Sequence, residues 1–510
     1  MKIERTKNAA RNVVFGVALK IYALALPFVM RTAMIYWLGI EYLGLNSLFT
    51  SVLQVLNLAE LGVGSAMTFS MYKPIAEDDK DKICALMNLY HFYYKVIGGV
   101  VLAGGLVVVP FLPNLIKGSV PPDINVYVLY LMNLAATVLT YWLFAYRNSI
   151  FNAYQRTDVV SKVTIVTDTI KYAIQLFVLA FFHSYYLYVI AILATQVLNN
   201  ISIAYFSRKM YPQYEPKGKV SKEEQREINK RIKDLFTSKL GGTIVGSADT
   251  IVISSFIGLR TLAIYQNYYY IITSLSGIVM ILFNAVTAGS GNSMVTESKE
   301  KNYHDFKKLS WITYWMIGFV VCGLFCLYQT LMKVWVGTDL MLDDNFIILF
   351  CLYFAGNMTI QLLSVYKNAA GIWHEDRFRP LISGLVNLAL NLLMVKFIGL
   401  YGIVLSTIIS VYLISAPWLL RNVFTLIFPG NFKDYGKDLL NYVVVITVGT
   451  FITSKVCGLI PDAGFGILIA KTVLCTVVYN GFLLLVYHRT PMFKEVLKMG
   501  NKLIKRREAL

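Results

Sequence analysis

Charged side chains are scarce in this sequence. Of its 510 residues, only 15% are Asp, Glu, Lys or Arg, whereas soluble globular proteins carry about 25%. Hydrophobic residues make up 57% of the chain, and its mean hydropathy is +0.58. A water-soluble fold could not bury this much apolar surface, so the composition predicts an all-α polytopic membrane protein whose solvent is mostly lipid.

The residues that usually carry catalysis and metal binding are also few. None of the five histidines forms a pair at metal-ligand spacing, and the sequence has no Gly-x-x-x-x-Gly-Lys-Ser/Thr loop for a nucleotide. The six cysteines are scattered. Cys322 and Cys326 share a helix face without a second ligand pair, so we interpret them as inert buried thiols. We expect no enzyme activity, no metal site and no cofactor, with H⁺ or Na⁺ as candidate coupling ions.

Acidic residues are outnumbered by basic ones. Lys and Arg number 47 against 29 Asp and Glu, which gives a net charge of +18. The basic residues lie in short clusters between apolar runs, which argues against nucleic acid as a partner. Nearly all loop Lys and Arg fall in one set of alternate loops, and this asymmetry predicts that both termini and the long 207–234 loop are cytoplasmic.

Long apolar runs dominate the rest of the chain. Windows of about 20 apolar residues predict about fourteen transmembrane helices. The second is expected at 43–72 and the seventh at 235–257. The only sizeable soluble segment is the 207–234 loop, where Ser221 is expected to cap a short charged helix that ends at Lys233.

An internal repeat organises these helices. Tyr146-Arg147-Asn148 recurs as Tyr366-Lys367-Asn368, 220 residues later, and Gly62-Val-Gly64 resembles Gly289-Ser-Gly291, 227 residues later. With six helices per copy, both copies have the same orientation, so the repeat is parallel. The predicted organisation is a six-helix lobe over 1–206, a cytoplasmic linker over 207–234, a second six-helix lobe over 235–428, two additional transmembrane helices over 429–487 and a basic cytoplasmic tail over 488–510.

Three sequence segments carry a family resemblance. Tyr42-Leu-Gly-Leu45-Asn-Ser-Leu-Phe49-Thr, Glu60-Leu-Gly-Val-Gly64 and the loop Ala76-Glu-Asp-Asp-Lys80 resemble Wzx-type polysaccharide flippases. These belong to the multidrug/oligosaccharidyl-lipid/polysaccharide exporter superfamily. The resemblance covers essentially the whole chain, and it implies two lobes around a central cavity that opens alternately to each membrane face.

The same resemblance implies a cargo and a location. The cargo would be an undecaprenyl-pyrophosphate-linked oligosaccharide, moved across the bacterial cytoplasmic membrane for capsule, O-antigen or exopolysaccharide synthesis. Membrane lipids, a polysaccharide polymerase and other assembly proteins would be partners. Three alternatives stay open: a lipid II flippase, a drug/cation exporter of the same superfamily, and, from a different class, a membrane-embedded polysaccharide polymerase.

Basic side chains at membrane depth are the candidate substrate contacts. Each costs about 2.5–3.5 kcal/mol at a helix centre on insertion scales, so each should face a wet cavity or a partner. Lys20 and Arg31 lie three helical turns apart on one face of the first predicted helix. We expect them, with Lys171, to bind a diphosphate headgroup, because basic side chains neutralise phosphate well where water is scarce. The alternative for each is snorkelling or an interhelical ion pair, and Asp168 is positioned to neutralise Lys171.

Carboxylates at membrane depth are candidates for ion coupling. Glu60 and Asp249 could exchange a proton or bind sodium during transport, and the alternative is that they, like Asp168, act as counter-ions to the basic residues. Lys239 and Lys471 are expected to snorkel to the interface. The remaining polar residues expected to face the cavity are Asn46, Gln54, Asn57 and Gln175.

The repeated Tyr-basic-Asn motif is a candidate cytoplasmic gate. Arg147 and Lys367 would pair with acidic residues such as Asp158 and Glu375 when the inward mouth closes. The alternative is positive-inside anchoring together with a cap for the helix end.

Overall fold

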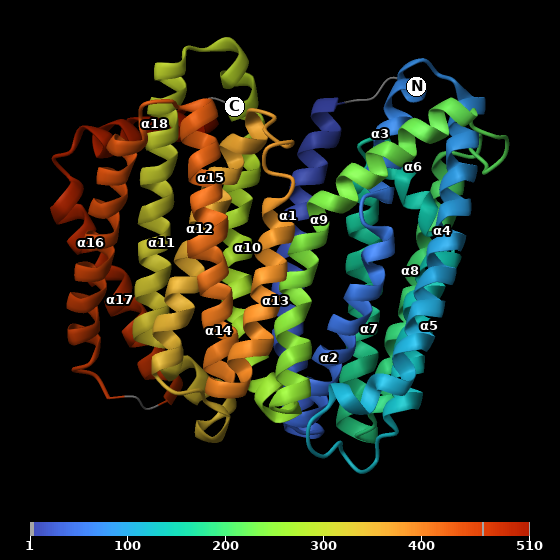
Figure 1. Ribbon diagram of the computed structural model, residues 1–510, viewed down its shortest axis with the longest axis horizontal. Coiled ribbons are helices and arrows are strands. Elements are labelled where there is room, and N and C mark those ends of the chain that lie inside the picture. The colour runs from blue at the N-terminus through green and yellow to red at the C-terminus, as the bar shows by residue number, and fades with distance from the viewer. Residues whose placement is uncertain (1–4, 462–463, 509–510) are drawn as a thin grey trace. The chain divides into compact units, whose positions relative to one another are not determined.

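The computed structural model describes residues 5–461 and 464–508, and all regular secondary structure in these ranges is helical, so the all-α prediction is confirmed (Figure 1). The chain divides into two compact units, Met1–Gln266 and Asn267–Leu510. This boundary falls inside a helix, whereas the repeat predicted a linker at 207–234. The predicted lobes over 1–206 and 235–428 stay a prediction.

The first unit, from Met1 to Gln266, contains nine α-helices and the start of a tenth among its described residues. Their bounds are α1 (Arg5–Trp37), α2 (Ile40–Leu56), α3 (Val63–Ala76), α4 (Lys80–Val108), α5 (Val126–Trp142), α6 (Asn148–Ala153), α7 (Thr157–Phe182), α8 (Tyr185–Met210), α9 (Lys222–Phe256) and α10 (Leu259–Thr296). Three short 3₁₀ segments join them: η1 (Asn57–Glu60), η2 (Val109–Leu115) and η3 (Ala145–Arg147).

The second unit begins within α10 and continues to the C-terminal helix. Its elements are α11 (Lys299–Val336), η4 (Thr338–Leu340), α12 (Asn345–Ala369), α13 (Arg379–Ile398), α14 (Leu400–Ile409), the π-helical η5 (Ser410–Ser415), α15 (Ala416–Asn422), the π-helical η6 (Val423–Ile427), α16 (Phe432–Cys457), α17 (Gly464–Tyr487) and α18 (Pro491–Glu508). The predicted additional pair corresponds to α16 and α17, and both pack against α11.

The described helices account for a multi-pass membrane protein. Twelve are long and apolar enough to cross a membrane, and a thirteenth crossing results if the bent pair Val126–Trp142 and Ala145–Ala153 counts as one. This agrees with a prediction of about fourteen spans. The predicted seventh span, 235–257, falls within α9, which is not among the apolar crossings. Ser221 caps α9 as expected, its Oγ accepting from the Glu224 amide at 3.2 Å. The short helix expected to end at Lys233 is instead the first part of this 35-residue helix.

The second predicted span, 43–72, is not continuous. It breaks at η1, between α2 and α3, and Gly62 caps α3 with a φ of 91°. A Cβ on Gly62 would lie 2.7 Å from the Leu235 Cβ of α9 and would also force a strained backbone. The break therefore depends on glycine at this position and on the close approach of α9.

The C-terminal tail folds as α18 and docks on α11. Phe493 packs against the rings of Trp311 and Trp315, with centroids 6.0 and 6.3 Å apart. Glu495 accepts from His304 at 2.8 Å and from Lys308 at 3.1 Å. These two partners hold the pKa of the Glu495 carboxyl below its ordinary value.

Candidate functional site

The broken crossing places a carboxylate beside a chain of hydroxyl groups. Glu60 is the last residue of η1, and the Tyr94 hydroxyl of α4 donates to its Oε1 at 3.3 Å. The Tyr90 hydroxyl, one turn earlier on α4, donates to the Tyr94 oxygen at 2.7 Å. Both tyrosines are buried. Glu60 therefore keeps acceptor capacity for a further proton or cation.

A cavity of about 630 Å³ opens beside this carboxylate. Gly64 keeps space next to it, because a Cβ there would lie 3.0 Å from the Tyr90 hydroxyl and 3.3 Å from the Glu60 Oε1. Helix breaks at membrane depth are tolerated where they line a cavity or a site, and this one does. The polar residues that line the cavity are Glu60, Ser65, Thr68, Tyr72, Tyr90, Tyr94, Asn148, Asn152 and Lys239.

Lys239 is the cation that faces this cavity. It lies on α9 and interacts electrostatically with the Glu60 carboxylate. Lys239 is also exposed, so the expectation that it snorkels stays a prediction. Asn57, three residues before Glu60, accepts from the Tyr141 hydroxyl at 3.0 Å, and the Tyr141 ring packs edge-on against Tyr94 at 5.5 Å. Two of the predicted polar residues, Asn57 and Glu60, thus belong to one site.

The predicted substrate cations lie on α1 and α7, two helices that pack against each other. Lys20 is exposed, and Arg31 is half-buried and interacts electrostatically with Tyr188. Lys171 contacts the Asp168 carboxylate at 2.7 Å within α7, and its Nζ lies 4.4 Å from the Tyr172 ring centroid. Because Asp168 neutralises Lys171, Lys171 is the weakest of the three candidates for binding an anionic ligand.

Four other predicted site residues lie apart from the Glu60 cavity. Asn46 accepts from the Tyr185 hydroxyl at 3.2 Å, and Gln54 is exposed on α2. Gln175 is buried and donates to the Tyr188 carbonyl at 3.4 Å. Asp249 is buried on α9, where it accepts from the Tyr265 hydroxyl at 3.4 Å. None of these four lines the cavity that contains Glu60.

The Tyr-basic-Asn motifs differ between the two units. Lys367 contacts Asp376 at 2.9 Å, where the sequence suggested Glu375 as its partner. Arg379 contacts the same carboxylate at 2.6 Å, and Asp376 is only 2% exposed. Glu375 and Asp376 are adjacent in one loop, and the sequence alone does not indicate which carboxylate faces Lys367.

Arg147, the equivalent residue in the first unit, does not pair with Asp158. That carboxylate contacts Arg156 at 2.8 Å and Lys162 at 3.3 Å instead. Arg147 is 2% exposed, with its guanidinium carbon 5.7 Å from the Tyr146 ring centroid. Sequence reasoning missed Arg156, Asp376 and Arg379. The available signal was an aspartate at or just before the start of a helix, with an arginine two or three residues away.

Helices long and apolar enough to cross a membrane, with a break between α2 and α3 beside a polar cavity, are typical of membrane transporters. The chain belongs to the family described as "Polysaccharide biosynthesis protein", which matches residues 9–288. No curated protein sequence matches the chain. The family resemblance predicted from the sequence is confirmed.

Solved structures share this fold at low sequence identity. A lipid II flippase, MurJ, in an inward closed conformation is 17% identical, with a TM-score of 0.68, and the match covers 93% of this chain and 99% of MurJ. An inward-facing multidrug resistance transporter of the MATE family, within the MOP superfamily, is 13% identical with a TM-score of 0.64, covering 82% and 99% of the two chains. A MOP superfamily transporter from Pyrococcus furiosus is 12% identical with a TM-score of 0.52, covering 82% and 95%.

Proposed function

We propose that this protein flips undecaprenyl-pyrophosphate-linked oligosaccharides across the bacterial cytoplasmic membrane for surface polysaccharide synthesis. Membership of a polysaccharide biosynthesis family supports the cargo class, and the fold supports alternating access. The observation that carries the proposal is the pair of basic side chains on α1, Lys20 and Arg31. A guanidinium at membrane depth suits a diphosphate, which it can bind through two parallel hydrogen bonds.

Arg31 is the residue to test first. Its side chain is half-buried beside Tyr188, so it is partly shielded from water while one side stays accessible. Lys20 lies three turns away on the same helix and would contact the same headgroup or the first sugar. Lys171 would contribute least, because Asp168 already neutralises it.

Glu60 is the proposed coupling residue. Its carboxylate lies at a helix break, beside a cavity, with a tyrosine hydroxyl on one oxygen and Lys239 nearby. Protonation of Glu60 would remove its attraction for Lys239 and so change the balance of contacts between η1 and α9. Asp249, buried on α9, is the second candidate.

The proposed orientation places both termini, the α8–α9 connection and the Tyr-basic-Asn motifs in the cytoplasm. Lys367 and its partner Asp376 would then belong to the cytoplasmic end of the second unit, and Arg147 to that of the first. Single cysteines introduced at Asn148 and Asn368 should react with a membrane-impermeant thiol reagent only in inside-out vesicles. Reaction in right-side-out vesicles would invert this topology.

The cargo test compares three substrates in proteoliposomes that contain the purified protein. A fluorescent undecaprenyl-pyrophosphate oligosaccharide should cross the bilayer faster than lipid II or a cationic dye. Arg31→Ala should reduce this flipping at least tenfold, while Arg31→Lys retains part of it. If Arg31→Ala flips the oligosaccharide lipid at the wild-type rate, Arg31 does not bind the headgroup.

Lipid II is the second candidate cargo. The lipid II flippase MurJ matches nearly the whole chain in structure, although at 17% identity it supports the fold alone. Faster transport of lipid II than of the oligosaccharide lipid would favour this alternative. Transport of only the cationic dye would indicate an exporter, and synthesis of polymer from lipid-linked units would indicate a polymerase.

A further inference from the structure

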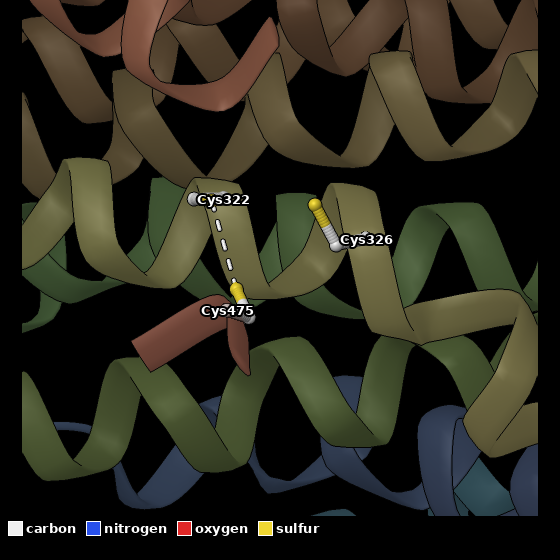
Figure 2. Close-up of side chains that lie close together, drawn as sticks. All are labelled: Cys322, Cys326 and Cys475. Carbon is white, nitrogen blue, oxygen red and sulfur yellow. Dashed lines mark hydrogen bonds between the residues drawn. The ribbon is translucent and has the colours of Figure 1, made fainter. Parts of the chain in front are cut away.

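Three cysteines converge inside the second unit. Cys322 and Cys326 lie one turn apart on α11, and Cys475 reaches them from α17 (Figure 2). The Cys322 and Cys475 sulfurs are 3.6 Å apart, and all three sulfurs lie within 4.8 Å of one another. The sequence identified the pair on α11 but not the third thiol, because Cys475 is about 150 residues away and joins them only through helix packing.

The spacing of the sulfurs fits a metal ion at their centre. Three points roughly 4 Å apart surround a centre that is about 2.3 Å from each, which is the usual zinc–sulfur distance. Thiolates are soft ligands that select Zn²⁺ and Cu⁺ over Mg²⁺ and Ca²⁺. Side chains of two packed helices hold the three sulfurs, so little rearrangement is needed to close the site.

A fourth thiol, a threonine hydroxyl and a lysine ammonium lie near the three cysteines. Cys457, the last residue of α16, interacts with Cys326, and Thr453, one turn earlier on α16, interacts with Cys322. Lys471 lies one turn before Cys475 on α17, is 4% exposed and interacts electrostatically with Cys457. This burial differs from the snorkelling predicted for Lys471 from the sequence, and negative charge nearby stabilises a buried ammonium.

We propose that Cys322, Cys326 and Cys475 bind one Zn²⁺ ion, with Cys457 as a fourth ligand within reach. Three thiolates and Zn²⁺ leave one negative charge, and binding of Cys457 as a fourth thiolate would leave two; the Lys471 ammonium offsets one of them. With the same ligands Cu⁺ would leave one further negative charge in this buried place, which favours the divalent ion. Binding to three thiols releases three protons to solvent, and no oxidant or reductant takes part.

The ion would fasten the appended helix pair to the second unit. Cys475 belongs to α17, Cys457 to α16 and the other two ligands to α11, so one ion connects three helices that already pack together. This inference does not depend on the proposed cargo. It predicts a structural metal in a protein whose sequence suggests none.

The first experiment uses the wild-type full-length protein. The protein is purified in detergent with a reductant, stripped with a chelator and incubated with Zn²⁺, and bound zinc is measured by mass spectrometry after removal of free ion. We expect one zinc per chain. Cd²⁺ in place of Zn²⁺ should give a thiolate-to-cadmium charge-transfer band in the ultraviolet.

Alkylation gives a second readout that needs no variant. Under mild detergent conditions, Zn²⁺ should slow alkylation of Cys322, Cys326 and Cys475 at least tenfold, as measured by peptide mass spectrometry. Cys84, a buried cysteine of the first unit whose Sγ contacts the Gln213 carbonyl, is the internal control and should react at the same rate with and without Zn²⁺.

Ligand variants then locate the ion. Cys475→Ala should weaken Zn²⁺ binding by roughly 100-fold or more, since even outer partners of a metal site are worth 10–100-fold. Cys84→Ala should bind as the wild type does. The proposal is overturned if wild-type protein binds no zinc beyond the amount retained by Cys475→Ala, if Zn²⁺ does not protect the three thiols, or if the isolated protein contains a Cys322–Cys475 disulfide.

Discussion

The segments Asn57–Gly64 and Asn284–Gly291 stand at the same place in the two copies of the repeat, yet they have different structures. The first is broken by η1, and the second continues without interruption inside α10. Gly62 is held in a left-handed conformation against Leu235, whereas a Cβ on Gly289 would meet nothing within 4 Å. Glu60 in the first copy corresponds to Thr287 in the second. The two aligned segments therefore differ in structure, and among these described residues the helix break with its carboxylate occurs in the first.

The neighbouring tyrosines repeat the contrast. Tyr94 and Tyr314 are equivalent at the 220-residue spacing, and both are buried. The Tyr94 hydroxyl donates to the Glu60 carboxylate, while the Tyr314 hydroxyl bonds to the neutral hydroxyls of Thr359 and Tyr435. The same residue type thus supports a charged site in one unit and a neutral core in the other.

Loss of Asp376 should have the largest effect on stability. Asp376→Asn leaves Lys367 and Arg379 nearly buried without their carboxylate, and breaking such a buried pair costs about 3–5 kcal/mol. Asp158→Asn in the first unit should cost less, because Lys162 is 45% exposed and can turn to water. Thermal unfolding in detergent measures both. Equal losses would show that the two loops are equivalent.

Glycine replacement should produce the next largest difference. Gly62→Ala forces a left-handed alanine, at about 1–2 kcal/mol, and a clash with Leu235, at about 1–3 kcal/mol. Gly289→Ala should instead stabilise α10 by up to about 1 kcal/mol, because it removes a glycine from a helix interior. The matched pair is measured by thermal unfolding. Equal tolerance of alanine at both positions would contradict a required break at Gly62.

Replacement of the equivalent tyrosines Tyr94 and Tyr314 by phenylalanine should give a smaller difference, which we expect in transport activity. Tyr94→Phe removes one hydrogen bond to the Glu60 carboxylate, and a bond to a charged group contributes about 1.5–3 kcal/mol. Flipping driven by an ion gradient should fall roughly tenfold. Tyr314→Phe should leave it within about twofold, since that hydroxyl bonds to neutral groups. A larger loss of gradient-driven flipping in Tyr314→Phe than in Tyr94→Phe would indicate that the coupling site lies in the second unit.

The sequence could predict features that depend on local pattern. Apolar windows predict the helices, and the spacing of Asp168 and Lys171 predicts their ion pair within α7. The serine at position 221, with glutamate at 224, predicts the hydrogen bond that caps α9. Features that depend on contacts between residues far apart in the sequence could not be predicted. The break beside Gly62 requires Leu235 of α9, and the thiol cluster requires Cys475 of α17. Neither contact can be recognised from the residues that flank it in the sequence.

The most direct test of the central claim, that the coupling chemistry lies in the broken helix of the first unit, is gradient-driven flipping by Glu60→Gln. Proteoliposomes are loaded with the fluorescent lipid-linked oligosaccharide, and a proton or sodium gradient is imposed. The wild type and Glu41→Gln, a control carboxylate at the start of α2, should flip faster when the gradient is applied. Glu60→Gln should flip at the same slow rate with and without the gradient. A full response to the gradient in Glu60→Gln would contradict the account.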